Sequence, residues 1–295
     1  MNEEDIFIVG YGGWVRLKMH PRGTYYNYKD PFNDATDGVM LQVTGASITR
    51  QANLPTVNSY YLPFHDAEGT ARSQILLGKG TFSFTGEISF EMTQGVLNTF
   101  FNDDFFERDT IFSMSFYDGQ NVCAVTNCVW SNFSIQCSPG NLVTVSMSYG
   151  SNNSHMEELQ VYPLDNDDEL IYDEHDLLIP YWTCGHEHFQ DFSLSFERPV
   201  SPIFLNGDLN VAAYLRPGLV TLNLQTTTIE YIDSWEKEIE IRLGCGEKEE
   251  KSIILDKSVL QSCNYDMSSM TDTGAKRYSW SSISLDAKDR VFRIL

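Results

Sequence analysis

The sequence predicts a mainly β fold, and three observations lead to this prediction. Aromatic residues make up 13% of the 295-residue chain, and aromatic and β-branched side chains favour strands. Many runs alternate apolar and polar residues with a period of two, which is typical of strands with one buried and one solvated face. Only residues 94–109 clearly place apolar side chains at helical spacing. The length suffices for one large or two ordinary domains.

Strand-like runs fill both halves of the chain. In the first half they are residues 6–19, 39–50, 81–92, 110–118, 123–137 and 141–150. In the second half they are residues 176–184, 189–197, 218–232, 238–244, 259–270 and 276–285. Residues 151–176 lie between the two series and are polar and acidic, which predicts an extended linker or arm. Residues 246–262 interrupt the second series in the manner of an insertion.

The order of these elements recurs in the two halves. Residues 46–63 correspond to 194–209, 81–92 to 213–232, 110–119 to 238–246, and 128–150 to 263–285. The order and the spacing are kept although the identity is low, which indicates a duplication. We therefore expect a first β domain at residues 1–150, the acidic linker at 151–176 and a second β domain at 177–295. Each domain is expected to carry a short helix. The counterpart in the second domain, residues 232–240, is shorter and is either a turn or one helical turn.

Residues 78–92, GKGTFSFTGEISFEM, begin like a phosphate-binding loop but do not fit one. A P-loop requires G-x-x-x-x-G-K-[ST], whereas Ser73 stands at the first glycine position and Gly80 follows Lys79. From Thr81 onward the residues alternate with a period of two, which predicts a long strand. One face of this strand is apolar. The other is polar and partly acidic, with Thr81, Ser83, Thr85, Glu87, Ser89 and Glu91.

The charge balance argues against tight binding of nucleic acid. The chain has 41 acidic and 20 basic residues, whereas phosphate binding requires clustered lysine and arginine. The chain has no stretch of eighteen apolar residues, and the N-terminal residues MNEED are acidic where a signal peptide would be basic, so we expect a soluble, unexported protein. The six cysteines form no C-x-x-C pair and are expected to stay reduced.

Catalytic and metal-binding patterns are weak. Cys184, His186 and His188 would share one face of a strand, but C-x-H-x-H matches no common zinc pattern, so they remain weak metal candidates. The chain has no G-x-S-x-G elbow. Glu87 and Glu91 lie along one strand and do not form the two facing walls that a glycosidase needs. We expect no enzymatic activity, no cofactor and no metal.

Several segments together give the chain a resemblance to a known family. In the first half they are VTGASITRQANLP, GTFSFTGEISFEMTQGVLNTFF and RDTIFSMSFYDG, and in the second FSLSFERPVSP and LVTLNLQTTTIEYI. Long amphipathic strands with an acidic face, a proline-bearing loop and a short helix recur on either side of an extended arm. This pattern, over nearly the whole chain, resembles a bacteriophage tail tube (major tail) protein with a duplicated tube domain.

The resemblance implies a structural virion protein of the phage tail. In that family the β-sandwich or barrel domains of neighbouring copies join their sheets into an oligomeric β-barrel, and the rings stack into a tube. A duplicated chain would form a ring of three copies. The acidic lumen lets DNA pass during ejection without specific binding. Expected partners are the chain itself and tape-measure, terminator and baseplate proteins, with no membrane, in a virion tail assembled in the host cytoplasm.

Within this family, the lumen-facing candidates are the polar residues of the strand at 81–92. They are Glu87, Glu91, Thr81, Ser83 and Thr85. Residues 110–118 and 238–244 are expected to be neighbouring strands of the channel wall.

Two other functions fit the same composition. The first is a carbohydrate-binding β-sandwich that uses exposed aromatic residues, with Tyr60, Tyr61, Trp130 and Trp182 as candidates. The second is another tail or baseplate component built on the same domain.

Overall fold

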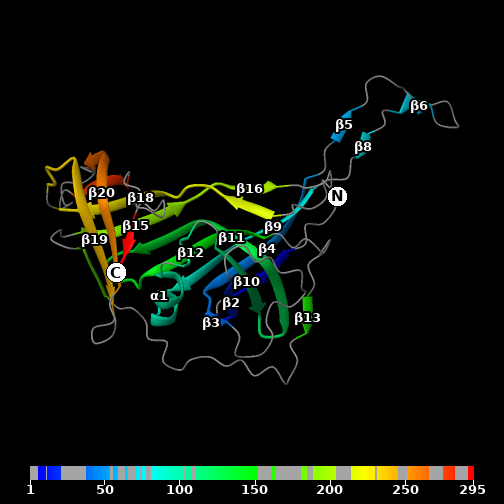
Figure 1. Cartoon of the computed structure of the whole chain (residues 1–295), viewed down its shortest axis with the longest axis horizontal. Coiled ribbons are helices and arrows are strands. Elements are labelled where there is room, and N and C mark those ends of the chain that lie inside the picture. The colour runs from blue at the N-terminus through cyan, green and yellow to red at the C-terminus, as the bar shows by residue number, and fades with distance from the viewer. Residues whose placement is uncertain are drawn as a thin grey trace.

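The computed structural model describes most of the chain. The described residues are 6–10, 12–20, 38–53, 56–58, 64–65, 71–72, 75–77, 81–102, 104–107, 110–151, 161–163, 181–184, 189–203, 214–229, 231–244, 251–265, 275–282 and 292–295. They confirm the mainly β prediction, since they form antiparallel sheets and a single helix (Figure 1).

The elements follow one another along both halves of the chain. From the first half come β1 (Ile6–Val9), β2 (Trp14–His20), β3 (Val39–Gln42), β4 (Gly45–Asn53), β5 (Thr56–Asn58), β6 (Phe64–His65), β7 (Ala71–Arg72), β8 (Ile75–Leu77), β9 (Thr81–Glu91), α1 (Gln94–Phe100), β10 (Ile111–Tyr117), β11 (Asn121–Cys137) and β12 (Thr144–Ser151). From the second half come β13 (Val161–Pro163), β14 (Tyr181–Cys184), β15 (Phe189–Glu197), β16 (Val200–Ile203), β17 (Tyr214–Pro217), β18 (Thr221–Thr228), β19 (Glu236–Gly244), β20 (Lys251–Tyr265), β21 (Lys276–Ser282) and β22 (Arg293–Ile294).

Several boundaries differ from those predicted. The run at 6–19 is two strands, because the chain turns at Gly12 with φ of 84°, a conformation that glycine adopts without strain. The acidic segment 151–176 contains β13, which pairs with the start of β11. Residues 246–262 are not a simple insertion, since β20 already begins at Lys251 and runs unbroken to Tyr265.

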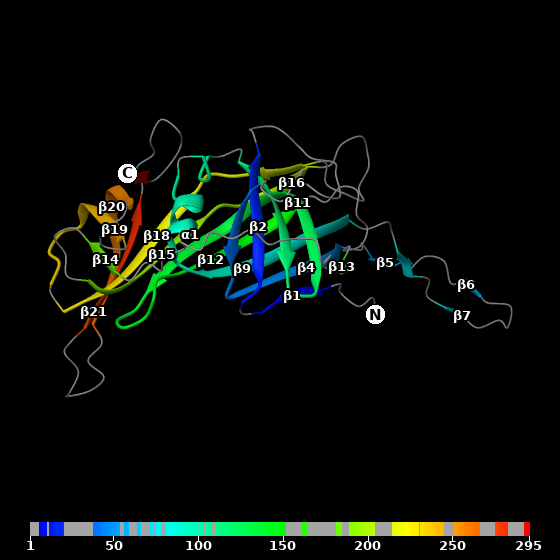
Figure 2. The same ribbon diagram turned by 90° about the horizontal axis from the view of Figure 1, so that it is seen from below.

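Sixteen strands form one open sheet. Its main path runs β1-β4-β9-β12-β11-β15-β18-β21-β20-β19-β14, and β10, β2 and β3 branch from β11. Figure 2 shows β1 and β4 toward one end of this path and β19, β20 and β14 at the other. The described strands do not close into a barrel within one chain. Three two-stranded sheets, formed by β5 with β8, β6 with β7, and β16 with β17, lie outside this path.

Two groups of four strands within this path have the same order. The first group is β4-β9-β12-β11 and the second is β15-β18-β21-β20. In each group the third and fourth strands along the chain exchange places in the sheet. The long strands β11 and β20 each run past their own group, where β11 pairs with β10 and β20 with β19. β10 then pairs with β2, and β19 with β14.

The two groups join edge to edge through β11 and β15. Six residue pairs connect these strands, from Asn132 with Glu197 to Cys137 with Phe192. Backbone pairing across this junction makes the two halves of the chain parts of one sheet.

The apolar face of the sheet is buried against α1 and the aromatic residues that follow it. Phe90 of β9 lies 5.4 Å from Phe100 of α1 between ring centroids. Phe105 and Phe106, beyond the helix, contact Trp130 of β11 at 6.1 and 5.6 Å. Aromatic burial of this kind contributes strongly to a core.

Helix α1 is shorter than predicted. The Thr93 hydroxyl accepts a hydrogen bond from the Val96 backbone N–H and so caps the N-terminus. The helix ends at Phe100, and the Asn102 side chain donates to the Thr99 carbonyl oxygen. In the second half the prediction of a helix is wrong for the described residues. Residues 231–235 form no regular element, and Glu236 already begins β19, because the sequence from there alternates with a period of two.

Candidate functional site: the polar face of the sheet

One face of the two four-stranded groups is mostly polar, and we call it the polar face. Its described side chains are Ser47, Thr49, Thr85, Glu87, Ser89, Glu91, Asn132, Ser134, Gln136, Thr144, Ser146, Ser148, Asp191, Ser193, Ser195, Glu197, Thr221, Asn223, Gln225, Thr227, Ser262, Asn264, Arg277, Ser279 and Ser281. Each strand contributes alternate residues, because successive side chains of a strand point to opposite faces.

The predicted division of β9 into an apolar and a polar face is confirmed for its described side chains. Phe84, Ile88 and Phe90 are buried, whereas Glu87 is exposed and Glu91 half-exposed. Thr85 is also half-exposed on the polar face. Thr81 and Ser83 belong to β9, but their side chains lie outside the described residues.

The predicted neighbours of β9 are wrong. β9 pairs with β4 and β12, whereas β10 pairs with β11 and β2, and β19 with β20 and β14. Every residue of β10 is buried, so this strand belongs to the core. Its mostly apolar sequence is typical of a strand covered on both faces.

Rows of matched residues cross the junction between the two groups. Ser89, Ser146, Ser134 and Ser195 face one another on β9, β12, β11 and β15. The hydroxyls of Ser134 and Ser146 are hydrogen-bonded at 2.7 Å. The next row contains Glu87, Ser148, Asn132 and Glu197. At the usual strand spacing, Glu87 and Glu197 are about 14 Å apart. The face therefore carries small hydroxyl and amide groups with separated carboxylates.

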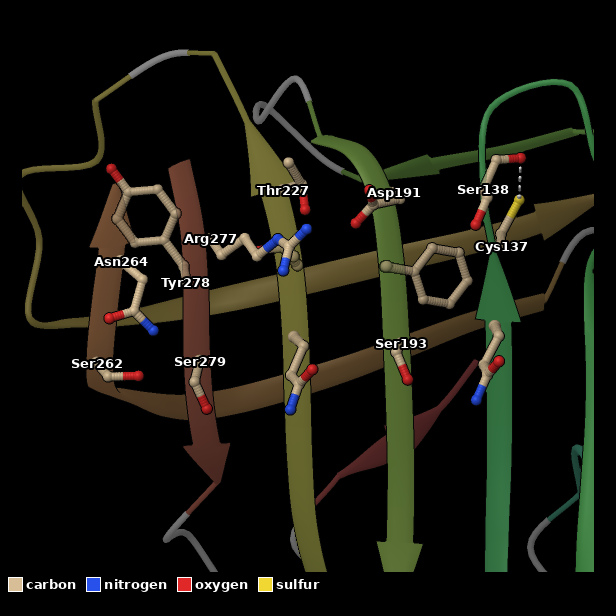
Figure 3. Close-up of a pocket in the computed structure, with 14 residues that line it drawn as sticks. Cys137, Ser138, Asp191, Ser193, Thr227, Ser262, Asn264, Arg277, Tyr278 and Ser279 are labelled. Carbon is tan, nitrogen blue, oxygen red and sulfur yellow. Dashed lines mark hydrogen bonds between the residues drawn. The ribbon is translucent and has the colours of Figure 1, made fainter. Parts of the chain in front are cut away.

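Carboxylates outnumber cations on this face. The described side chains comprise four carboxylates, on Glu87, Glu91, Asp191 and Glu197, and the single guanidinium of Arg277. Figure 3 shows Arg277 extending from β21 across β18, on the side where Asp191 lies on β15. β18 itself contributes Thr221, Asn223, Gln225 and Thr227, none of which carries a charge. The face as a whole should repel a polyanion.

Three charged residues of this face were not among the predicted site residues. Asp191, Glu197 and Arg277 come from the second half of the chain. The signal for two of them was present, since residues 191–197 alternate and place Asp191 and Glu197 on one face with Ser193 and Ser195.

The alternative candidates gain no support from the described residues. Trp130 is fully buried, and Trp182 is half-buried against Phe192 with 4.6 Å between ring centroids, so Trp130 is not available to stack on a sugar. Tyr60 and Tyr61 lie outside the described residues, as do His186, His188 and the side chain of Cys184. No group of three metal-ligand side chains gathers within the described part of the chain.

The only helix among the described residues spans seven residues, and no described helix is long and apolar enough to cross a lipid bilayer.

Comparison with known protein families and with curated protein sequences finds no match to this chain.

Proposed function

We propose that this protein is a structural subunit of a bacteriophage tail tube. Two copies of a tube-like β domain, at residues 1–150 and 177–295, contribute adjacent parts of the channel wall. Three chains supply six four-stranded groups, which close into a ring. The rings stack into a tube, and tape-measure, terminator and baseplate proteins act at its ends.

The observation that carries this proposal is the repeated strand order within one continuous sheet. β4-β9-β12-β11 is joined to β15-β18-β21-β20 by the pairing of β11 with β15. In both groups a paired excursion leaves the sheet between the first and second strands: β5 with β8 and β6 with β7 in the first group, and β16 with β17 in the second. A duplicated domain explains this agreement, and a sheet that repeats edge to edge within a chain is suited to repeat between chains.

The polar face supplies the second argument. A channel for DNA needs a wall that does not hold phosphate, and such holding requires clustered lysine and arginine. The described wall residues offer hydroxyls, amides and four carboxylates against one guanidinium. On this proposal Glu87, Glu91, Asp191 and Glu197 line the lumen.

Negative-stain microscopy and light scattering of the purified chain test the proposal. Rings or tubes with a central channel are expected, with a ring mass close to three chains. A protein that remains a single chain at all concentrations and ionic strengths would contradict it. Rings that never stack would instead favour another tail or baseplate component built on the same domain.

A further inference from the structure

The junction between β11 and β15 provides a template for the contact between two copies of the chain. Here the two groups meet with Asn132 opposite Glu197 and Ile135 opposite Leu194. Between these pairs, Phe133 and Phe196 face each other with 6.1 Å between ring centroids. The side chains of Phe133 and Phe196 are buried, and both contact the ring of Phe106.

The two strands of this junction, β11 and β15, have counterparts at the outer edges of the two groups, where β20 corresponds to β11 and β4 to β15. The register between β11 and β12 shifts between Trp130 and Asn132, and that between β20 and β21 shifts between Leu260 and Ser262. From these bulges, one matched row runs through Trp130, Tyr149, Gly86 and Ile48. The other runs through Leu260, Trp280, Leu224 and Leu194. Thus β20 takes the position of β11, and β4 that of β15.

The edge of β20 that corresponds to the junction has no described strand beside it. β19 pairs with β20 as far as Val259, and the Leu260 N–H donates to the Trp235 carbonyl oxygen. Beyond this point, residues 261–265 pair only with β21 among the described strands. An open edge of this kind presents unpaired N–H and C=O groups and is a template for another strand.

Exposed aromatic residues border this open edge. The exposed fractions of Trp235 and Tyr231 are 75% and 61%, and both residues line a groove with Leu260 and Cys263. At the internal junction the region under Phe133 and Phe196 is filled by buried aromatic residues. Large exposed aromatic residues beside an open strand indicate a surface that becomes covered.

The opposite edge, on β4, is covered by a short strand of the same chain. β1 pairs with residues 46–49 of β4 through four residue pairs, fewer than the six pairs at the internal junction. Its Ile8 is 67% exposed. β1 therefore occupies the position that β11 takes on β15, with a smaller contact.

We propose that the open edge of β20 pairs with β4 of a second copy and displaces β1 from it. Transferring the internal register places Ser262 opposite Gln51, Cys263 opposite Arg50, Asn264 opposite Thr49 and Tyr265 opposite Ile48 of the second copy. This inference rests on the proposed ring and adds to it the strand register and a protective role for β1. While β1 covers β4, the separate chain has one blocked edge, which limits uncontrolled pairing.

A single substitution tests the register, because Cys263 supplies one thiol. Directly opposite residues in an antiparallel pair have Cα atoms about 4.5–5.5 Å apart, within the range that a disulfide spans. R50C is expected to give covalently linked dimers and trimers under mild oxidation, with a 50–263 linkage by mass spectrometry. A52C, on the same face two residues along, is the matched control and should give much less. R50C/C263S should give none.

Ring formation is measured on the same samples before oxidation. Rings of R50C with no more 50–263 linkage than the A52C control shows would overturn the register while leaving the proposed function standing. If R50C fails to fold, T49C/N264C in the C263S background tests the same register on the polar face. Absence of self-association in the wild-type chain would contradict the proposed function itself.

The role of β1 is tested with a reversible lock. Ile8 and Ser47 are paired residues of β1 and β4, so I8C/S47C is designed to hold β1 in place by a disulfide. The oxidised chain, with the linkage checked by mass spectrometry, is expected to remain single, and reductant should restore assembly to the wild-type level. Equal assembly of the oxidised and reduced samples would show that β1 does not need to leave.

Discussion

The Arg198 guanidinium lies over the indole of Trp130, with 3.8 Å from its central carbon to the ring centroid. Its Nε donates to the Trp130 carbonyl oxygen at 2.7 Å, and its backbone N–H donates to the Ser131 carbonyl oxygen at 2.9 Å. Arg198 follows β15 directly and is only 2% exposed. It therefore connects the end of β15 to the bulge of β11 and holds the two four-stranded groups together at one end of their junction.

Replacement of Arg198 should destabilise the chain substantially. R198M keeps much of the apolar volume but leaves the Trp130 carbonyl oxygen without this donor and removes the stacking of the guanidinium on the indole. We expect a loss of about 2–4 kcal/mol in the free energy of unfolding, measured by urea denaturation. R242M removes an exposed arginine that pairs with Glu240 at 2.9 Å, and should cost less than about 1 kcal/mol. Equal effects of the two variants would show that Arg198 does not fasten the junction.

Gly86 of β9 should not tolerate any side chain. A Cβ at this position would fall on the carbonyl oxygen of Ser47 and on the Tyr149 hydroxyl, and would lie 2.6 Å from the Tyr149 Cζ. The Tyr149 hydroxyl donates to that same Ser47 oxygen at 3.1 Å. G86A is therefore expected to cost about 3 kcal/mol, because the obstructing atom on β4 belongs to the backbone of a paired strand.

Two variants separate this clash from other effects at Gly86. G45A adds a methyl group where the nearest atom would be the Val9 carbonyl oxygen at 4.0 Å, and its free energy of unfolding should change by less than about 1 kcal/mol. Y149F removes only the hydrogen bond to Ser47 and should cost about 1 kcal/mol. If G86A is no more destabilising than G45A, the backbones of β4 and β9 do not approach each other closely enough at Gly86 to exclude a Cβ.

Buried thiols should make the stability fall at alkaline pH. Burial raises the pKa of Cys123 from 9.0 to about 12, because the thiolate is poorly solvated inside the core. The unfolded chain loses this proton above pH 9 while the folded chain retains it, so stability is full below pH 9 and is lost between pH 9 and 12. The slope from this thiol is at most about 1.4 kcal/mol per pH unit.

The variant C123A isolates this contribution. Its free energy of unfolding should be lower than that of the wild type at pH 7, because a small cavity replaces the thiol. The difference should narrow as the pH rises from 9 to 10.5, since only the wild type has this proton to lose. A constant difference across this range would show that Cys123 ionises alike in both states.

The positions of strands were predictable where one face of the strand is buried and the other is exposed to solvent. Residues 189–197 form β15 with the predicted bounds and alternate from Asp191 to Glu197, and the face of β9 that carries Glu87 is exposed as expected. The helix was predicted too long, because Phe105 continues the apolar spacing although Phe101 already leaves the helical conformation at φ −95°, ψ 63°. Local periodicity does not report the tertiary packing of the aromatic residues that follow.

Partners between strands were not predictable in the same way. The expectation that residues 110–118 adjoin β9 failed, because pairing depends on edges brought together over long sequence separations. β9 instead lies between β4 and β12. β11 pairs with β15 although the acidic segment 151–176 separates these strands in the sequence. Asp191 and Glu197 join the polar face only through this last pairing, so a strand-by-strand analysis could place them on a face but not in the site.

Charge reversal on the polar face should change the interaction with DNA and not the fold. Glu87 is exposed and Glu91 half-exposed on β9, so E87K/E91K should alter the free energy of unfolding by less than about 1 kcal/mol. In assembled rings the wild-type face should not retain short duplex DNA, because its carboxylates repel phosphate. The variant should bind DNA with an affinity that falls steeply with salt, since counterions are released from the phosphates.

The matched control reverses the charge of two glutamates that lie outside the polar face. Glu236 and Glu238 lie on β19, away from the polar face, with side chains 56% and 61% exposed. E236K/E238K should leave the assembled rings without measurable DNA binding inside the channel, detected as protection of the DNA from nuclease. Equal protection by the two variants would mean that net charge alone attracts DNA and that Glu87 and Glu91 do not line a channel. Loss of folding in E87K/E91K would instead show that Glu87 and Glu91 make contacts needed for the fold and do not lie on an exposed face of β9.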